Sequence, residues 1–185
     1  RFGMTETQTA VGVLDLRLLR LALLRPDREK YAASLSKIGI LLAYFQRQAQ
    51  AAGVIPAPIR HELGLMIKAS DDVTATKFSQ ELGLDWIQSV LNSHHFYEAN
   101  RGGGIWMGKH YGVAGERRGS PVGDNSHAAT VRQVMRYFLR LAQGNLISAE
   151  ASAGMREIFE SPAIPHDDIK FVKGLAGREV QLLRK

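Results

Sequence analysis

The apolar stretch at residues 33–52 constrains the fold of this 185-residue chain more than any other segment. Its large apolar residues recur at steps of three and four, the period of one helix face: Ile38, Leu41, Leu42 and Phe45. Gly39 is the one interior residue there with a poor helix propensity. We therefore predict a long, largely buried helix.

Both ends of the chain show the pattern of β-strands. Residues 9–24 are rich in Val and Leu and have a polar break at residues 15–17, which is typical of a two-stranded hairpin. Arg25, Pro26 and Asp27 end the second strand. Residues 179–183, Glu-Val-Gln-Leu-Leu, predict another strand.

Helices are predicted for most of the chain between these strands. The residues that mark their starts and ends are Pro56, Pro58, Gly83, Ser126 and Gly144. The predicted ranges are 56–69, 72–82, 85–91, 127–143 and 149–159. The fourth of these helices is expected to direct four side chains inward: Val131, Met135, Phe138 and Leu139.

The segment at residues 92–125 has a different character, because it is rich in glycine and has few periodic apolar residues. A loop of this length inside a compact domain is often functional. We interpret the three glycines at residues 102–104 as a flexible turn.

Strands, then many helices, then a strand is not the alternation of a βαβ fold. The order predicts an α/β protein of the α+β type, with a helical body packed on an antiparallel sheet built from both termini. A content of 45% hydrophobic residues is sufficient for a sizeable core, so we expect residues 1–185 to form a single domain.

The composition disfavours several classes of protein. The net charge is +6, which favours an anionic partner, but the basic residues are scattered and no nucleic-acid-binding motif accompanies them. Arg132, Arg136 and Arg140 are predicted to form a solvated helix face. No apolar run is long enough for a transmembrane segment. The histidines lack metal-site spacing, so no metal or cofactor is implied.

Ser34 and Lys37 begin the most apolar helix. A step of three residues places both side chains on one helix face, about 5–6 Å apart at Cβ. A serine hydroxyl becomes a nucleophile when a neighbouring amine accepts its proton, and an apolar setting favours the neutral amine. The alternative is that Ser34 caps the helix and Lys37 lies on the surface.

A second polar group, Ser70, Asp71 and Asp72, follows one helix later. Its hydroxyl has the chemistry to relay a proton to a leaving group, and its acidic side chains have the chemistry to hold a lysine. The alternative is a helix N-cap without any catalytic role.

In this order and helix context, residues 31–38 and 68–76 resemble the SxxK and SDN elements of class A β-lactamases and penicillin-binding proteins. Residues 123–130 resemble the junction that follows the omega loop of that family, and the similarity extends from about Thr9 to the end. The resemblance implies a β-lactamase/transpeptidase-like fold and a serine hydrolase that acts by acyl transfer.

The resemblance also assigns roles to residues. Ser34 would attack an amide, β-lactam or ester carbonyl after Lys37 accepts its proton; Ser70 would pass that proton to the leaving group. Asp72 would orient Lys37. The family's third motif, KTG, is matched best by Lys185, which would attract a substrate carboxylate; Lys173 is the other candidate. If Lys185 has this role, the C-terminal strands are missing and the domain is incomplete at its C-terminus.

Two departures from the family pattern bear on activity. Asp72 replaces an asparagine, and its charge would pair with Lys37 and make the lysine a poorer base. The ExxLN motif, whose glutamate activates water for deacylation, is absent, and the loop acids Glu98 and Glu116 do not match it. We therefore expect slow release of the acyl group.

Other functions remain open at this level. One is a penicillin-binding-protein-like peptidase or esterase, or a homologue that binds its ligand with slow turnover. Another is a non-catalytic basic helical adaptor, in which both motifs are helix caps. The resemblance implies a small-molecule or peptidoglycan-like substrate and a periplasmic or extracellular location. It leaves the oligomeric state open.

Overall fold

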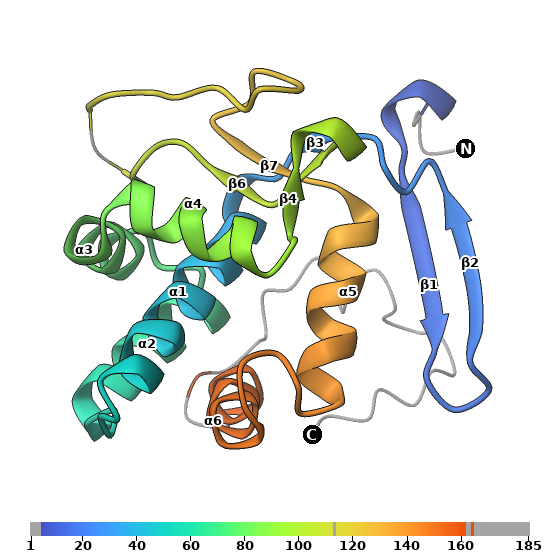
Figure 1. Ribbon diagram of the computed structural model, residues 1–185. Coiled ribbons are helices and arrows are strands. Elements are labelled where there is room, and N and C mark those ends of the chain that lie inside the picture. Colours follow the sequence, from blue (N-terminus) through green and yellow to red (C-terminus); the bar gives the residue numbers. More distant parts are fainter. Residues whose placement is uncertain (1–4, 113, 162–163, 165–185) are drawn as a thin grey trace.

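The computed structural model describes residues 5–112, 114–161 and 164 (Figure 1). A short 3-10 turn, Glu6–Gln8, precedes the N-terminal hairpin of β1 (Val11–Asp15) and β2 (Arg20–Leu24). The two strands are antiparallel, with Val11 opposite Leu24 and Asp15 opposite Arg20. The predicted hairpin is confirmed. The strand predicted at residues 179–183 lies outside the described residues.

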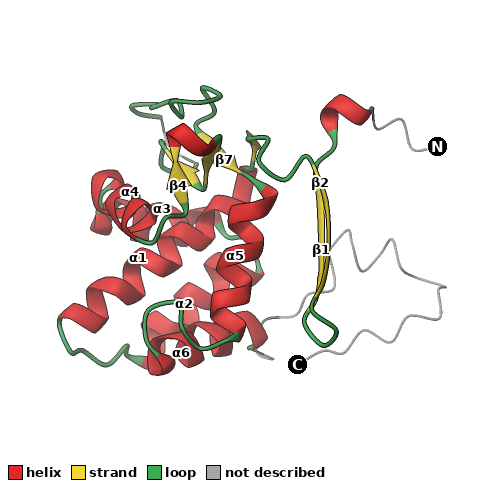
Figure 2. Cartoon of the chain, turned by 45° about the vertical axis from the view of Figure 1, so that its right-hand side comes forward, coloured by secondary structure: helices red, strands yellow, loops and turns green. Residues whose placement is uncertain are grey.

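Six α-helices form the body of the described part of the chain (Figure 2). They are α1 (Lys37–Gln50), α2 (Ala57–Lys68), α3 (Asp72–Leu82), α4 (Leu84–Ser93), α5 (Val131–Ala142) and α6 (Ala149–Glu160). A 3-10 turn, Ala33–Ser36, leads into α1. None of the described helices combines the length and apolar character needed to cross a membrane.

Helix α1 is the centre of this body, as its apolar pattern predicts. Its residues from Lys37 to Phe45 are all buried, and α2, α3, α4 and α6 all contact it. Most of the first nine side chains of α1 are apolar. The helix therefore packs against other elements on every side and has no solvent-exposed face over this length. Its N-terminus therefore lies where the surrounding elements converge.

Local signals set the boundaries of α3. Asp71 is its N-cap, and the Asp71 carboxylate accepts a 2.7 Å hydrogen bond from the Thr74 N–H. At the other end, Gly83 adopts a φ of 81°, a conformation that favours glycine, and stops the helix. The tight turn at Ser70, with a φ of 57°, directs the start of α3 toward the start of α1.

The prediction that Ser126 caps a helix is wrong. His127–Ala129 forms a strand, β7, and Thr130 caps α5 by accepting a 3.3 Å hydrogen bond from Gln133 N–H. Strand β7 lies between β3 (Lys30–Tyr31) and β6 (Trp106–Met107) in an antiparallel sheet. Pairing with two distant segments outweighs the local capping preference of Ser126.

The predicted inward face of α5 is also wrong. The helix buries Gln133, Tyr137 and Leu141, while Phe138 is 39% exposed. Helix α5 lies between the hairpin and the other helices, so that two of its faces are covered (Figures 1 and 2). On the hairpin side, a Cβ at Gly12 would lie 2.1 Å from the Met135 sulfur.

The glycines at residues 102–104 do not form the predicted flexible turn. Gly103–Gly104 is strand β5, pairs with β4 (Tyr97–Glu98) and is buried. A Cβ at Gly104 would lie 2.0 Å from the Phe96 carbonyl oxygen, so glycine is required by close backbone packing. This two-stranded sheet stiffens part of the long segment at residues 92–125.

The row of arginines on α5 is not a purely solvated face. Arg132 forms two hydrogen bonds to the Asp27 carboxylate, of 2.5 and 2.8 Å. The guanidinium groups of Arg136 and Arg140 lie 5.8 and 5.7 Å from the centre of the Phe96 ring. The row therefore holds α5 against neighbouring segments.

Candidate active site

Ser34 lies in the 3-10 turn before α1, where its side chain is exposed and borders a cavity of about 250 Å³. In the described part of the chain, the Ser34 hydroxyl has no hydrogen-bond partner. The cavity is also lined by Tyr31, Ala33, Asp72, Lys109, His110, Tyr111, Gly112, Ser126 and His127. Ser34 is thus a free hydroxyl at the edge of a polar hollow.

The backbone around Ser34 is held firmly. Ala33 has a φ of 46°, a left-handed conformation that costs a non-glycine residue about 1–3 kcal/mol. The carbonyl oxygen of Ala33 accepts hydrogen bonds from the Tyr111 hydroxyl and from Ser36 Oγ, both of 3.0 Å. On the other side, Ala32 N–H donates a 3.0 Å bond to the His127 carbonyl oxygen. These contacts fix the strained turn that carries the serine.

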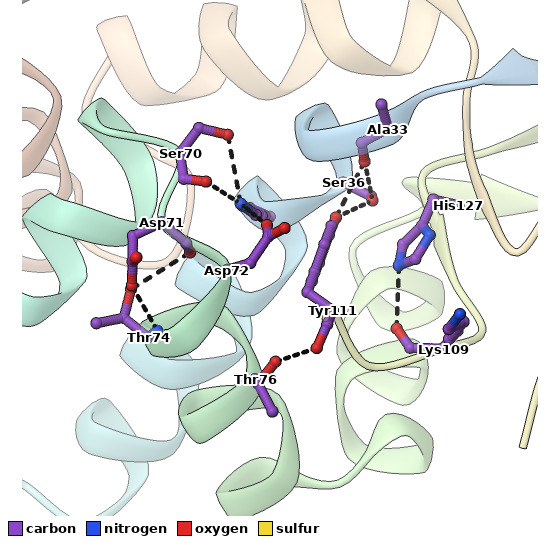
Figure 3. Close-up of polar contacts among 11 residues, drawn as sticks. Ala33, Ser36, Ser70, Asp71, Asp72, Thr74, Thr76, Lys109, Tyr111 and His127 are labelled. Carbon is purple, nitrogen blue, oxygen red and sulfur yellow. Dashed lines mark hydrogen bonds and ion pairs between the residues drawn. The ribbon is translucent and has the colours of Figure 1, made fainter. Parts of the chain in front are cut away.

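Lys37 follows this turn as the first residue of α1, and only 2% of its side chain is exposed. Its ammonium group donates to the Ser70 carbonyl oxygen at 2.5 Å, to Asp72 Oδ1 at 2.6 Å and to Ser70 Oγ at 3.3 Å (Figure 3). Three acceptors use all three protons of an ammonium ion. Lys37 is therefore joined to both ends of the Ser70–Asp72 turn.

Asp72 and Asp71 have different tasks in that turn. The Asp72 side chain is 57% exposed, so one oxygen pairs with Lys37 while the group stays largely solvated at the cavity. Asp71 accepts bonds from the N–H and the Oγ1 of Thr74, and these bonds lower the pKa of its carboxyl group. Asp71 therefore keeps the turn folded, and Asp72 contacts the lysine.

Tyr111 completes the wall beside Lys37, and the sequence pattern did not indicate it. Its ring centre lies 4.7 Å from the Lys37 Nζ, and its hydroxyl lies 2.7 Å from Ser36 Oγ (Figure 3). Burial raises the pKa of this phenol far above its ordinary value, so it stays neutral. The contact joins residues 75 positions apart, which no local pattern indicates.

His127 lies on the far side of Tyr111, and the sequence marked it only as one of several scattered histidines. Its ring stacks on Tyr111 with the centres 4.5 Å apart, and its Nε2 lies 3.0 Å from the Lys109 carbonyl oxygen (Figure 3). Burial lowers the pKa of this imidazole below its ordinary value, which favours the neutral ring.

Other predicted residues lie elsewhere. Lys173 and Lys185 fall outside the described residues. Glu98 faces His95 and Arg101 at 3.4 and 3.7 Å, and Glu116 pairs with Arg118 at 3.2 Å. Neither glutamate borders the cavity beside Ser34. Across residues 5–112, 114–161 and 164, no cluster of three or more potential ligands suits a metal ion.

Comparison with known proteins yields structural matches only. No family of known sequences and no curated protein matches the chain. Among solved structures, a β-lactamase from Sphaerobacter thermophilus aligns over 84% of this chain and 65% of its own, with 17% identity and a TM-score of 0.62. A β-lactamase from Desulfarculus baarsii aligns over 82% and 62%, with 15% identity and a TM-score of 0.63.

A class A β-lactamase from Mycobacterium abscessus also aligns, over 82% of this chain and 64% of its own, with 18% identity and a TM-score of 0.62. The chain thus spans between 62 and 65% of the length of these three structures. The predicted β-lactamase-like fold, with helices and antiparallel strands, is confirmed. At such identities the likeness concerns the fold alone.

Proposed function

We propose that the protein is a serine hydrolase that forms an acyl-enzyme on Ser34, with an amide, β-lactam or ester carbonyl as its target. One observation carries the proposal. Buried Lys37, three residues after the exposed Ser34, contacts Ser70 Oγ and Asp72 Oδ1, and Ser34 and Asp72 line the same polar cavity. Helix caps alone have no need of a buried ammonium group, because a capping side chain works at the surface.

In the proposed acylation, Lys37 first gives up a proton to solvent water and then accepts the proton of the Ser34 hydroxyl. The Ser34 oxygen forms a bond to the carbonyl carbon, and the bond to the leaving group breaks. Ser70 Oγ, which is bonded to Lys37, passes the proton to the departing atom. The Ser34 N–H at the positive end of α1 helps to hold the oxyanion.

The position of Asp72 supports the expectation of a modest acylation rate. Its carboxylate pairs with Lys37 at 2.6 Å and so favours the ammonium form, which has no lone pair for the Ser34 proton. Deprotonation of Lys37 must therefore precede each attack. This supports a slow acyl transferase or peptidase more than a fast β-lactamase.

The substrate proposed is a small molecule or a peptidoglycan-like peptide in the periplasm or outside the cell, with Lys185 as the group that attracts its carboxylate. The charges at the cavity fit a negatively charged ligand, since Lys109 and Lys37 border or underlie it and Asp72 is already paired. The solved β-lactamases of the same fold add support by analogy.

Covalent labelling tests the proposal. The protein is incubated separately with a fluorescent penicillin and with a fluorophosphonate, and the adduct is located by peptide mass spectrometry. We expect one adduct, on Ser34, which is absent in Ser34→Ala and retained in the matched control Ser89→Ala on an exposed part of α4. If neither reagent labels Ser34, the hydrolase proposal fails, and the result favours the alternative of a non-catalytic helical adaptor.

A further inference from the structure

Among the described residues that line the cavity beside Ser34, one carboxylate is found, and it is engaged by Lys37 through one oxygen. Asp72 is the only acidic residue among the described residues that line it, and its carboxylate is paired with Lys37. Glu98 and Glu116 are paired with arginines away from the cavity. The imidazoles at this cavity are therefore the other groups to consider for taking the proton of the attacking water.

Hydrogen bonding fixes which nitrogen of His127 is free. The Lys109 carbonyl oxygen is only an acceptor, so His127 Nε2, at 3.0 Å, must donate its proton. The neutral ring then carries its lone pair on Nδ1. His127 Nδ1 has a long hydrogen-bond contact of 3.4 Å with the Ser126 hydroxyl, and Ser126 also lines the cavity. The basic nitrogen is therefore lightly bound.

His127 belongs to the cluster around the nucleophile. Its ring stacks on Tyr111, and the Lys37 ammonium lies 4.7 Å from the centre of the same Tyr111 ring. Its carbonyl oxygen holds Ala32, two residues before Ser34. His127 and Ser34 border the same cavity.

Burial, aided by two nearby cations, lowers the pKa of His127 and favours the neutral imidazole at physiological pH. Burial is the main cause of its lowered pKa, and the cations of Lys109 and Lys37 act in the same direction. The Lys109 carbonyl oxygen and the Asp72 carboxylate oppose them. Two rings pack against it, Tyr31 and Tyr111, and burial raises the pKa of Tyr111, which keeps that phenol neutral. A neutral imidazole whose Nδ1 has only a long contact with a hydroxyl has the chemistry of a general base.

We propose that His127 is the general base for hydrolysis of the acyl-enzyme on Ser34, an inference that rests on the proposed function. His127 Nδ1 takes a proton from water as the water oxygen bonds to the acyl carbon. The bond between that carbon and the Ser34 oxygen then breaks, and the product acid leaves. The Ser34 oxygen takes up the proton that His127 holds, which restores both groups.

His110 is the rival imidazole at this cavity, but its hydrogen bond anchors it to α3. Its Nδ1 lies 2.7 Å from Ser79 Oγ, on the buried face of α3. Ser79 Oγ in turn donates to the Thr76 carbonyl oxygen at 3.1 Å, so His110 Nδ1 is the donor. His110 has no contact with Tyr111 or Lys37 comparable to the stacking of His127.

The test separates the two chemical steps with p-nitrophenyl acetate. The burst of p-nitrophenol reports acylation of Ser34, and the steady state that follows reports hydrolysis of the acetyl-enzyme. The variant is His127→Gln, because the glutamine amide still donates to the Lys109 carbonyl oxygen but has no basic nitrogen. His61→Gln on the exposed side of α2 is the control, and Ser34→Ala gives the background.

We expect His127→Gln to keep the burst of p-nitrophenol. Its steady-state rate should be about 10²–10⁴-fold lower than that of the wild type, which is the usual contribution of one general base. The wild-type steady-state rate should rise with pH to a plateau, with its midpoint below 6.5, and the variant should lack this transition. The ¹⁵N shifts of wild-type His127 should show a protonated Nε2 and a bare Nδ1, which is a readout independent of activity.

Several results overturn the inference while acylation stands. In His127→Gln, these are an unchanged steady-state rate or an equal loss of burst and steady-state rate. In the wild type, they are a burst without steady-state turnover or a proton on His127 Nδ1. A loss of the steady-state rate in His110→Gln instead of His127→Gln would also overturn it. If the wild type gives no burst above Ser34→Ala, the proposed function itself fails and this inference fails with it.

Discussion

Lys37 Nζ and Asp72 Oδ1 lie 2.6 Å apart and join the first turns of α1 and α3, although 35 positions separate them in sequence. The two side chains differ in environment, since the lysine is 2% and the aspartate 57% exposed. The lysine side chain loses its contact with solvent on folding, whereas more than half of the aspartate side chain stays exposed to solvent. Asp72 is therefore the charged group that the buried lysine contacts directly.

Asp72→Asn should increase the acylation rate. The amide oxygen still accepts a hydrogen bond from Lys37, but the negative charge that favours the ammonium form is gone. A half-exposed ion pair contributes about 0.2–1 kcal/mol, which corresponds to an increase of up to about fivefold. The measurement is the second-order rate of Ser34 labelling by fluorescent penicillin near neutral pH. A slower rate would show that Asp72 has a role beyond its charge.

Lys37→Met should abolish labelling while the fold is kept. Methionine fills a similar volume, removes a buried charge, and leaves Asp72 solvated, so the free energy of unfolding should change by less than about 1–2 kcal/mol. Loss of the base should slow acylation by about 10²–10⁴-fold. Labelling and thermal denaturation are compared with Lys77→Met, whose lysine is 46% exposed on α3 and should behave as wild type. Rapid labelling of Lys37→Met would assign the base elsewhere.

The helices and the start of the site follow from local signals. A period of three and four residues marks α1, and the Asp71 cap and Gly83 mark the two ends of α3. The resemblance to a known motif order then places Ser70 and Asp72 beside Lys37, and the hydrogen bonds agree.

The rest of the site depends on contacts between distant segments. Tyr111 reaches Ser36 and Ala33 across 75 and 78 positions, and β7 forms because two strands from elsewhere flank it. Ser126 has good capping chemistry, but strand pairing decides its environment. Local patterns carry no information about such partners, so His127 and Tyr111 emerge only from the fold.

Tyr111→Phe should change how stability depends on pH. Burial raises the pKa of Tyr111, so above pH 10 the unfolded chain loses a phenolic proton that the folded chain keeps. Stability should therefore fall as pH rises, by about 1.4 kcal/mol per pH unit for such a group, and the variant should show a shallower decline. Near neutral pH, loss of the hydroxyl should cost about 0.5–1.5 kcal/mol.

Denaturant unfolding at about pH 8 and about pH 11 measures this slope. Tyr137→Phe is the matched control, because Tyr137 is also buried with a raised pKa, yet its hydroxyl faces Met155 in the core. Both variants should flatten the alkaline decline, but only Tyr111→Phe should also slow the labelling of Ser34. Equal slopes in wild type and Tyr111→Phe would contradict the burial argument.

Gly104→Ala should destabilise the fold from a position that carries no chemistry. The added Cβ would lie 2.0 Å from the Phe96 carbonyl oxygen and 2.9 Å from the Tyr97 Cα, so the β4–β5 pair must separate. Such overpacking costs roughly 1–3 kcal/mol, and backbone has less freedom to yield than a side chain. For a chain of this size the melting temperature should fall by about 2–4 °C per kcal/mol.

Gly115→Ala is the control, because nothing lies within 4 Å of its Cβ position, and its stability should stay within about 0.5 kcal/mol of wild type. If both variants melt together, β4 and β5 are not tightly packed, and the stiffness assigned to the segment in front of the site is wrong.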